Sequence, residues 1–178
     1  LPPIGAPAVV ERTGVPEVVF GSFNKLDKTT PEVLGTWAEI MDRCPGSRLV
    51  LRNRGLADGP VAERILEILA GAGVAADRVV LRDWVPHDEL LAGYAEIDIG
   101  LDTFPFSGGL TSCEALWMGV PVVTWAGDRM CGRQTASFLS RVGLEDLVAG
   151  TRPEYIERAV DLAVDGARRT SLRRELRG

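Results

Sequence analysis

The sequence predicts an α/β fold built on a doubly wound parallel sheet. Short runs of almost purely apolar residues alternate along the chain with stretches in which apolar residues recur at helical spacing. Strands without polar alternation are typical of a parallel sheet that helices cover on both faces. With 178 residues, the chain has the length of one domain that can bury a core of its own.

The first half of the chain is expected to hold three strands and two helices. The strands are the apolar runs at residues 17–23, 49–51 and 79–81. The first helix begins where Thr30 can cap it and Pro31 suits its first position. The second helix is marked by apolar residues at helical spacing, namely Val61, Ile65, Ile68 and Leu69.

The second half continues this alternation. A short helix is expected at residues 88–94, and a fourth strand follows at 97–101. A loop rich in proline and glycine then leads to a helix at 111–118 and a fifth strand at 121–124. Two further helical patterns fill residues 134–142 and 154–162.

The composition argues against several classes of protein. The net charge of −5 excludes a diffuse basic surface for nucleic acid, so any phosphate must be held by a focused site. No apolar run approaches the ~20 residues that span a bilayer, so no membrane partner is expected. Three cysteines at unrelated spacings and a single histidine, His87, predict neither a zinc cluster nor a disulfide framework. This usage indicates a reducing, cytoplasmic setting.

The two ends are expected to lie outside the main unit. Residues 1–16 are rich in proline and lack the pattern of a signal peptide, so we interpret them as a linker from an upstream region. Residues 17–166 would form the Rossmann-like unit, and residues 167–178 the start of a C-terminal helix. The arginines of that helix are most simply a solvated face. The sequence is thus expected to be a piece of a longer protein.

In such a sheet, ligands bind at the carboxyl ends of the strands, where the connections diverge. Three loops meet this condition, at residues 22–30, 83–89 and 102–114. In the third loop, Gly108 and Gly109 let the backbone approach a ligand without obstruction by a Cβ atom. This loop is therefore the first candidate for a binding site.

The helix that starts after this turn supplies donors and an acceptor. The amides of Leu110, Thr111 and Ser112 would be unpaired and point toward an anion, to which Thr111 or Ser112 could add a hydroxyl. Glu114, about one turn further, is placed to accept hydrogen bonds from neutral hydroxyls such as a ribose diol. The alternative is a turn with a capping threonine and a glutamate that merely favours the helix dipole. The pattern is neither a G-x-G-x-x-G fingerprint nor a Walker A loop.

Six segments spread over nearly the whole chain carry a family resemblance: 20–28 (FGSFNKLDK), 36–40 (TWAEI), 45–49 (PGSRL), 98–102 (DIGLD), 114–124 (EALWMGVPVVT) and 133–137 (RQTAS). The sequence resembles the C-terminal catalytic region of the O-GlcNAc transferase / SPINDLY family of GT-B glycosyltransferases, and residues 114–124 are similar to its bacterial branch. Members bind UDP-N-acetylglucosamine between two Rossmann-like lobes and transfer the sugar to Ser or Thr hydroxyls without a metal. Many carry tetratricopeptide repeats ahead of the catalytic part.

The resemblance implies that this chain is the second, donor-binding lobe of an inverting, metal-independent glycosyltransferase. It implies a nucleotide-sugar donor, no metal or other cofactor, and an acceptor protein bound through an upstream region. The residue that accepts the proton of the attacking hydroxyl would then lie in the other lobe. The isolated chain is accordingly expected to bind the nucleotide without turning over.

By position, Lys28 matches the lysine that contacts the donor's diphosphate. Breaking the anomeric bond puts negative charge on the departing UDP, which an ammonium and helix amides stabilise, so a catalytic role is expected. Lys25 is also expected near the donor, with a solvated lysine as the alternative. Thr111 and Ser112 match the phosphate-binding turn, and Glu114 matches the acidic residue that holds the ribose hydroxyls.

The stretch Val85-Pro86-His87 matches the loop whose backbone reads the uracil edge. His87 would contact the base, or else be an exposed loop histidine. The sequence also departs from the family, since histidines found in relatives are replaced here by Leu90 and, for animal members, by Gly109.

Other residues are given mainly structural roles. Arg133 is expected to bond carbonyls inside the lobe rather than the donor, and the four tryptophans are expected to pack rather than to form a sugar platform. In a GT-B fold, the terminal arginines could instead belong to a helix that crosses back to the first lobe.

Two alternatives stay open. The chain could belong to a related GT-B enzyme that uses GDP-fucose or UDP-glucose, or to an epimerase. It could also be a non-catalytic interaction domain, which the absent histidine at Leu90 favours and the presence of Lys28 and Glu114 disfavours.

Overall fold

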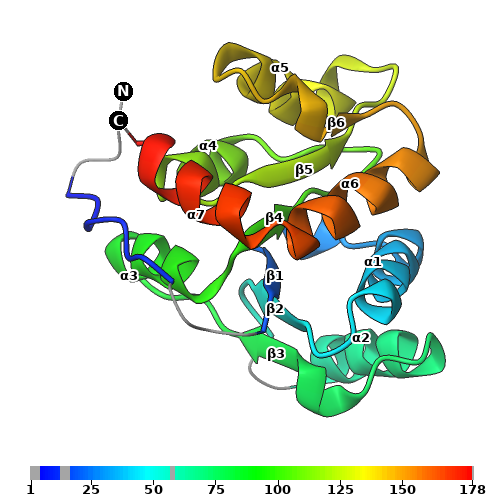
Figure 1. Cartoon of the computed structure of the whole chain (residues 1–178). Coiled ribbons are helices and arrows are strands. Elements are labelled where there is room, and N and C mark those ends of the chain that lie inside the picture. Colours follow the sequence, from blue (N-terminus) through cyan, green and yellow to red (C-terminus); the bar gives the residue numbers. More distant parts are fainter. Residues whose placement is uncertain (1–4, 13–16, 57–58, 178) are drawn as a thin grey trace.

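The computed structural model of the chain describes residues 5–12, 17–56 and 59–177. Six parallel strands form one sheet in the order β3-β2-β1-β4-β5-β6 (Figure 1). The strands are β1 (Val19–Ser22), β2 (Arg48–Arg52), β3 (Val79–Arg82), β4 (Ile99–Leu101), β5 (Val122–Trp125) and β6 (Val148–Ala149). The order grows outward in both directions from β1 and β4, which confirms the doubly wound sheet expected from the sequence.

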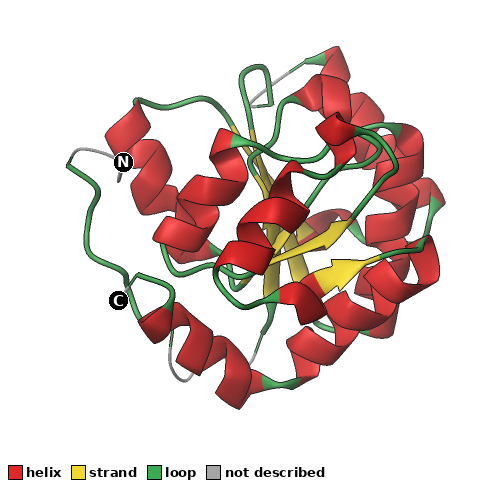
Figure 2. Ribbon diagram, turned by 90° about the horizontal axis from the view of Figure 1, so that it is seen from above, coloured by secondary structure: helices red, strands yellow, loops and turns green. Residues whose placement is uncertain are grey.

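Helices cover both faces of this sheet (Figure 2). The α-helices are α1 (Pro31–Arg43), α2 (Pro60–Gly71), α3 (His87–Gly93), α4 (Leu110–Trp117), α5 (Gln134–Arg141), α6 (Arg152–Val164) and α7 (Gly166–Glu175). Helix α1 packs against α2 and α6, and α4 packs against α5. Crossovers between parallel strands are right-handed as a rule. Those that leave β1 and β4 in opposite directions therefore place their helices on opposite faces of the sheet. In the described part of the chain, no helix has the length and apolar content needed to cross a membrane.

Local sequence signals determine where two of these helices begin. The Thr30 hydroxyl accepts a hydrogen bond from the Val33 amide (3.3 Å), and Pro31 occupies the first position of α1, as expected. Thr151 caps α6 in the same way by accepting from the Glu154 amide (3.3 Å). These caps act within a few residues, so they can be read from the sequence.

The core lies between the sheet and the helices on each face. Leu49 and Ile99, on two strands that flank β1, are completely buried. Trp37 of α1 donates through Nε1 to the Tyr155 hydroxyl of α6 (3.0 Å), and that hydroxyl donates to the Asp102 carbonyl (3.0 Å). Buried Tyr and Trp side chains usually find such hydrogen-bond partners for their polar atoms. The chain of contacts thus connects the helix layer to the end of β4.

The structure differs from expectation in β6 and in the buried face of α2. Strand β6 was not expected, because two residues beside β5 are too few to show a periodicity. Val61 is 48% exposed, whereas Ala62, Ile65 and Leu69 are buried. These three residues recur every three or four positions and share one face of α2, from which Val61 is rotated away.

The described residues 5–12 lie against α7 (Figure 1). Arg173 of α7 donates through Nη1 to the Val10 carbonyl (3.2 Å) and through Nη2 to the Ile97 carbonyl. It is 5% exposed, and burial lowers the pKa of its guanidinium. The expectation that the α7 arginines form a solvated face is therefore wrong for Arg173, because folding brings carbonyls from two distant segments to it.

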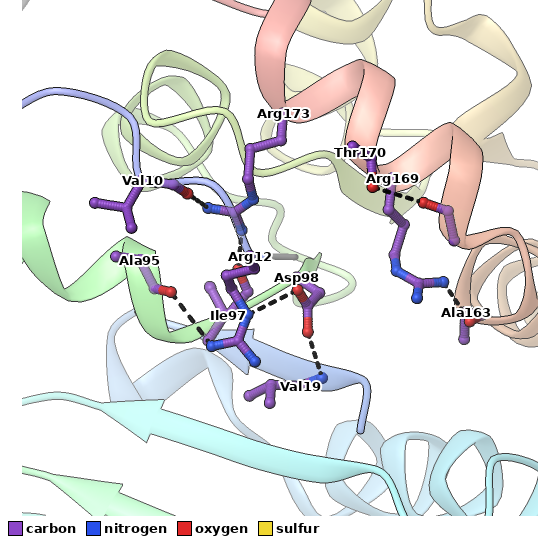
Figure 3. A network of polar contacts seen from close by, with 11 residues as sticks. Val10, Arg12, Val19, Ala95, Ile97, Asp98, Ala163, Arg169, Thr170 and Arg173 are labelled. Atoms are coloured by element: carbon purple, nitrogen blue, oxygen red, sulfur yellow. Dashed lines mark hydrogen bonds and ion pairs between the residues drawn. The ribbon is translucent and has the colours of Figure 1, made fainter. Parts of the chain in front are cut away.

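Arg12 ties the same segment to the sheet (Figure 3). Its Nε donates to Asp98 Oδ1 at 2.9 Å, and Asp98 Oδ2 accepts the Val19 amide at the start of β1 (2.8 Å). The interpretation of residues 1–16 as a linker stays a prediction, and part of that range lies outside the described residues.

Candidate functional site

Two loops meet at the carboxyl edge of the sheet, where the strand order reverses. The chain leaves β1 toward β2 and leaves β4 toward β5, which lie on opposite sides of the β1–β4 pair. The loops that follow these two strands therefore diverge, as they do in doubly wound sheets that bind ligands at this point. The Thr111 hydroxyl donates to Asn24 Oδ1 (2.9 Å) and so connects the two sides.

Lys28 reaches from the loop after β1 to the loop after β4. It ends a short 3-10 helix (Leu26–Lys28), and its Nζ donates to the Ser107 carbonyl at 2.8 Å. The ammonium also lies 4.3 Å from the centroid of the Phe106 ring, a cation–π distance. Burial lowers the pKa of Lys28 because the charged form loses hydration, while the Asp102 carboxylate raises it. An anion bound here would favour the charged form.

Asp102, which the sequence analysis did not single out, holds the loop after β4 in shape. It is 1% exposed, and its Oδ1 accepts the amides of Thr103 (2.9 Å) and Gly108 (2.6 Å). Its Oδ2 accepts the Thr124 hydroxyl of β5 (2.7 Å). Burial raises the pKa of Asp102, and these hydrogen bonds act against that rise. An acidic residue directly after a buried strand and before a glycine-rich loop is the sequence signal that could have identified it.

Neighbouring side chains come close to the two glycines of this loop. A Cβ atom on Gly108 would overlap the Ser112 hydroxyl oxygen, and one on Gly109 would lie 2.9 Å from Gln134 Oε1. The close approach of α4 to the turn therefore requires Gly108, whereas the flexible Gln134 side chain can move aside for a side chain at position 109. The expectation that the two glycines make room for a ligand stays a prediction.

The first turn of α4 presents backbone amides rather than hydroxyls. The Thr111 hydroxyl is committed to Asn24, and the Ser112 hydroxyl pairs with a hydroxyl of α5 at 2.8 Å. The Ser112 amide donates to the Gly109 carbonyl (3.1 Å), which contradicts the expectation that it is unpaired. As far as the chain is described, the amides of Leu110 and Thr111 have no backbone acceptor.

Helix α3 brings His87 to Glu114 of α4. His87 Nε2 lies 2.7 Å from Glu114 Oε1. The Glu114 side chain is 3% exposed and that of His87 is 58% exposed, so the pair joins a buried carboxylate to the surface. Tyr94, which follows α3, adds a second connection by donating its hydroxyl to the Thr111 carbonyl (3.0 Å). The sequence analysis assigned His87 and Glu114 to one ligand separately, and the structure places them in contact.

The other predicted site residues lie near His87 or near Lys28. Val85 is half-buried and Pro86 is exposed, directly before α3. Lys25 is exposed and lies close enough for its charge to lower the pKa of Lys28. What these three residues bind stays a prediction.

Arg133 and Trp125 have the structural roles that the sequence suggested. Arg133 Nη1 donates to the Gly127 carbonyl (3.2 Å). Trp125 packs against Phe104, with 4.8 Å between the ring centroids. Trp84 is the exception to the expected packing, because it is 54% exposed.

A hollow of about 680 Å³ lies beside Lys28. Its lining includes the aromatic residues Phe104, Phe106 and Trp125 and the charged residues Glu32, Asp128 and Arg129. Across residues 5–12, 17–56 and 59–177, no three His, Cys, Asp or Glu side chains gather closely enough to hold a metal ion. Whether the chain works without a metal stays a prediction.

Comparison with known proteins places this geometry in a family. A family model described as "Glycosyl transferase family 41" matches residues 9–177. The SPINDLY protein of Solanum lycopersicum, described as a probable UDP-N-acetylglucosamine--peptide N-acetylglucosaminyltransferase, is 44% identical over 162 residues. That match covers 90% of this chain and 17% of the relative. The SEC protein of Arabidopsis thaliana, with the same description, is 34% identical over 167 residues, which are 92% of this chain and 17% of that protein.

Solved structures agree with this placement. A mutant of the O-GlcNAc transferase of Thermobaculum terrenum has a TM-score of 0.92 and 44% identity, and the match covers 99% of this chain and 34% of that one. The Anabaena protein HepE, solved in complex with UDP and glucose, has a TM-score of 0.64 at 17% identity, covering 90% of this chain and 42% of that one. The latter likeness concerns the fold alone. The chain thus spans about a third of the solved transferase and a smaller share of the curated relatives.

Proposed function

Because the chain belongs to glycosyl transferase family 41, we propose that it is the donor-binding lobe of a transferase that moves N-acetylglucosamine from UDP-N-acetylglucosamine to Ser or Thr hydroxyls of proteins. The SPINDLY and SEC relatives are described as enzymes that use UDP-N-acetylglucosamine, which supports this donor over GDP-fucose or UDP-glucose. The acceptor protein would be bound by the part of the transferase that this chain does not cover. The three cysteines are free, in keeping with the proposed cytoplasmic setting.

The observation that carries the proposal is the position of Lys28. Its ammonium lies 2.8 Å from the Ser107 carbonyl, in the loop that leads to the Leu110 and Thr111 amides, which have no backbone acceptor in the described part of the chain. A cation held against this loop and the free backbone amides at the end of the loop are together suited to a diphosphate. Glu114 would hold the ribose and residues 85–87 the uracil. Lys28, Glu114 and residues 85–87 would then bind the diphosphate, the ribose and the uracil, in the order in which these parts are joined in the donor.

The chemistry follows from where charge develops. In an inverting transfer, the acceptor oxygen attacks the anomeric carbon from the side opposite to UDP, and the bond to the UDP oxygen breaks. The electron pair of that bond stays on the diphosphate, where Lys28 and the amides of Leu110 and Thr111 would stabilise the added charge. We propose that this charge stabilisation replaces a metal ion, and that the proton acceptor lies in the other lobe.

Titration calorimetry with UDP tests the assignment of Lys28. Lys28→Ala should weaken UDP binding at least about tenfold, because a charge-assisted contact to the diphosphate is lost. Lys28→Arg should retain most of the affinity. GDP should compete poorly with UDP if residues 85–87 read the uracil.

Arg64→Ala is the matched control, because Arg64 is an exposed cation on α2 and is not one of the proposed site residues. It should leave UDP binding unchanged. If UDP binds the chain equally well with and without Lys28, the proposed site is wrong.

A further inference from the structure

The Glu114 carboxylate is a buried acid that has one side-chain partner among the described residues. Its side chain is 3% exposed, and its Oε1 lies 2.7 Å from His87 Nε2. Among the described side chains, no arginine or lysine forms an ion pair with Glu114. A carboxylate has two oxygens with about four acceptor positions, and among the described residues only Oε1 is engaged.

The groups around this carboxylate leave its second oxygen for a ligand. Tyr94 is completely buried nearby, but its hydroxyl donates to the Thr111 carbonyl rather than to Glu114. Burial raises the pKa of Tyr94 well above its usual value, and the charge of Glu114 adds to that rise, so Tyr94 does not neutralise the acid. Among the described residues, no hydrogen-bond donor contacts Oε2, so this oxygen can still accept from a ligand.

We infer that His87 is a positioning residue for Glu114: it donates from Nε2 to Oε1 and thereby aims Oε2 at the ribose diol of the donor. This inference rests on the proposed function. A carboxylate fixed at one oxygen can rotate less, so the hydroxyl that meets Oε2 forms a better-aligned hydrogen bond. The Nε2–H donor exists in the cation and in one neutral tautomer, so the arrangement does not require a charged imidazole.

The geometry also separates this role from two others. If His87 served only to join α3 to α4, it would duplicate the hydrogen bond of Tyr94 to Thr111, which already connects these elements. If it served only to contact uracil, nothing would require its Nε2 to lie 2.7 Å from a buried carboxylate. Of these three roles, only the positioning role predicts that a change at His87 alters the selectivity for ribose over deoxyribose.

The experiment compares the affinities for UDP and 2′-deoxy-UDP by titration calorimetry with the full 178-residue chain. The native chain should bind UDP about tenfold or more tightly than the deoxy ligand, since a buried acceptor is left without its hydroxyl. Glu114→Ala should bring this ratio close to one. His87→Phe, which keeps an aromatic ring without the donor, should reduce the ratio several-fold, whereas His87→Gln, which retains an N–H donor, should preserve most of it.

The double variant His87→Phe with Glu114→Ala should show the same ratio as Glu114→Ala alone, because His87 acts through Glu114. Glu89→Ala, an exposed residue of the same helix, is the matched control and should keep the native ratio. Urea unfolding of each variant reports whether the fold is retained.

Two results separate failure of this inference from failure of the proposed function. If His87→Phe weakens both ligands equally and leaves the ratio native, while Lys28→Ala still weakens UDP binding at least about tenfold, the positioning role is overturned and the proposed function stands. If the native chain binds neither ligand, the proposed function fails and the inference fails with it.

Discussion

The ammonium of Lys28 is held between an aromatic face and a carbonyl, and this surrounding determines how readily it keeps its proton. The Phe106 ring and the Ser107 carbonyl both attract a cation, yet burial removes water that would hydrate it. Burial has the larger effect, so the pKa of Lys28 is lowered. A lysine that is poised in this way responds strongly to an incoming anion.

As the pH rises, we expect the affinity for UDP to begin to fall at a lower pH than it would if Lys28 had the pKa of an unperturbed lysine. An unperturbed lysine titrates at 10.5, and the folded chain lowers the pKa of Lys28 below this value. As the pH rises, the ammonium that attracts the diphosphate is therefore lost first in the native chain. Lys28→Arg should retain its affinity over the same range, because a guanidinium does not lose its proton there.

Calorimetric titrations at several alkaline pH values measure this difference. Uracil loses a proton in the same range, so the quantity to compare is the ratio between the native chain and Lys28→Arg. Parallel curves for the two proteins would show that the charge of Lys28 does not govern binding.

At the scale of one element, the beginning of α4 is determined by what lies against it. Asp102 accepts the Gly108 amide, and Ser112 of α4 lies where a side chain on Gly108 would have to go. The turn is therefore fitted to its helix even before any ligand is considered. Lys28 contacts the Ser107 carbonyl of the same turn, and this turn leads to the amides of Leu110 and Thr111.

Gly108→Ala should destabilise the chain by about 1–3 kcal/mol, because the new methyl group overlaps the Ser112 oxygen in a tightly packed site. Gly35→Ala in α1 is the control, since a Cβ atom there meets nothing within 4 Å. That substitution should stabilise the chain by about 0.5–1 kcal/mol, because alanine favours the helix. Urea unfolding measures both free energies.

A double variant tests whether the overlap with the Ser112 oxygen causes this loss of stability. Ser112→Ala combined with Gly108→Ala should cost less than the sum of the two single changes, because the overlapping oxygen is gone. Strict additivity would mean that Gly108 is required for another reason.

At the scale of the whole molecule, segments from opposite ends of the sequence form one structure. Residues 5–12 lie against α7, and Arg173 joins both to the carbonyl of Ile97 beside β4 (Figure 3). Gly119, which follows α4 with a φ of 76°, comes so close to α7 that a Cβ atom would lie 2.6 Å from the Arg173 carbonyl. The position of α7 is thus determined by several parts of the chain together.

Arg173→Ala should lower the free energy of unfolding by about 2–3 kcal/mol, because two hydrogen bonds from a charged donor are lost and the Ile97 carbonyl is left without it. Arg174→Ala is the matched control on the next residue. Arg174 pairs with Glu11 at the surface, where ion pairs contribute little, so this variant should unfold close to the native chain. Equal losses in the two variants would show that the burial of Arg173 is unimportant.

The sequence by itself determined the features that depend on near neighbours. The apolar runs predicted five of the six strands, Thr30 marked the start of α1, and the glycines before Leu110 marked the turn into α4. Such signals act over a few residues through burial, capping and backbone freedom. The family resemblance extended them to candidate ligand contacts.

Only the tertiary structure decided which distant side chains meet. His87 and Glu114 are 27 residues apart, Arg173 and Val10 are 163 apart, and β6 exists because β5 lies beside two suitable residues. Asp102 likewise became a central acceptor only once the loop after β4 folded over it. The partner of a buried polar group depends on which segments pack together, and no local pattern carries that information.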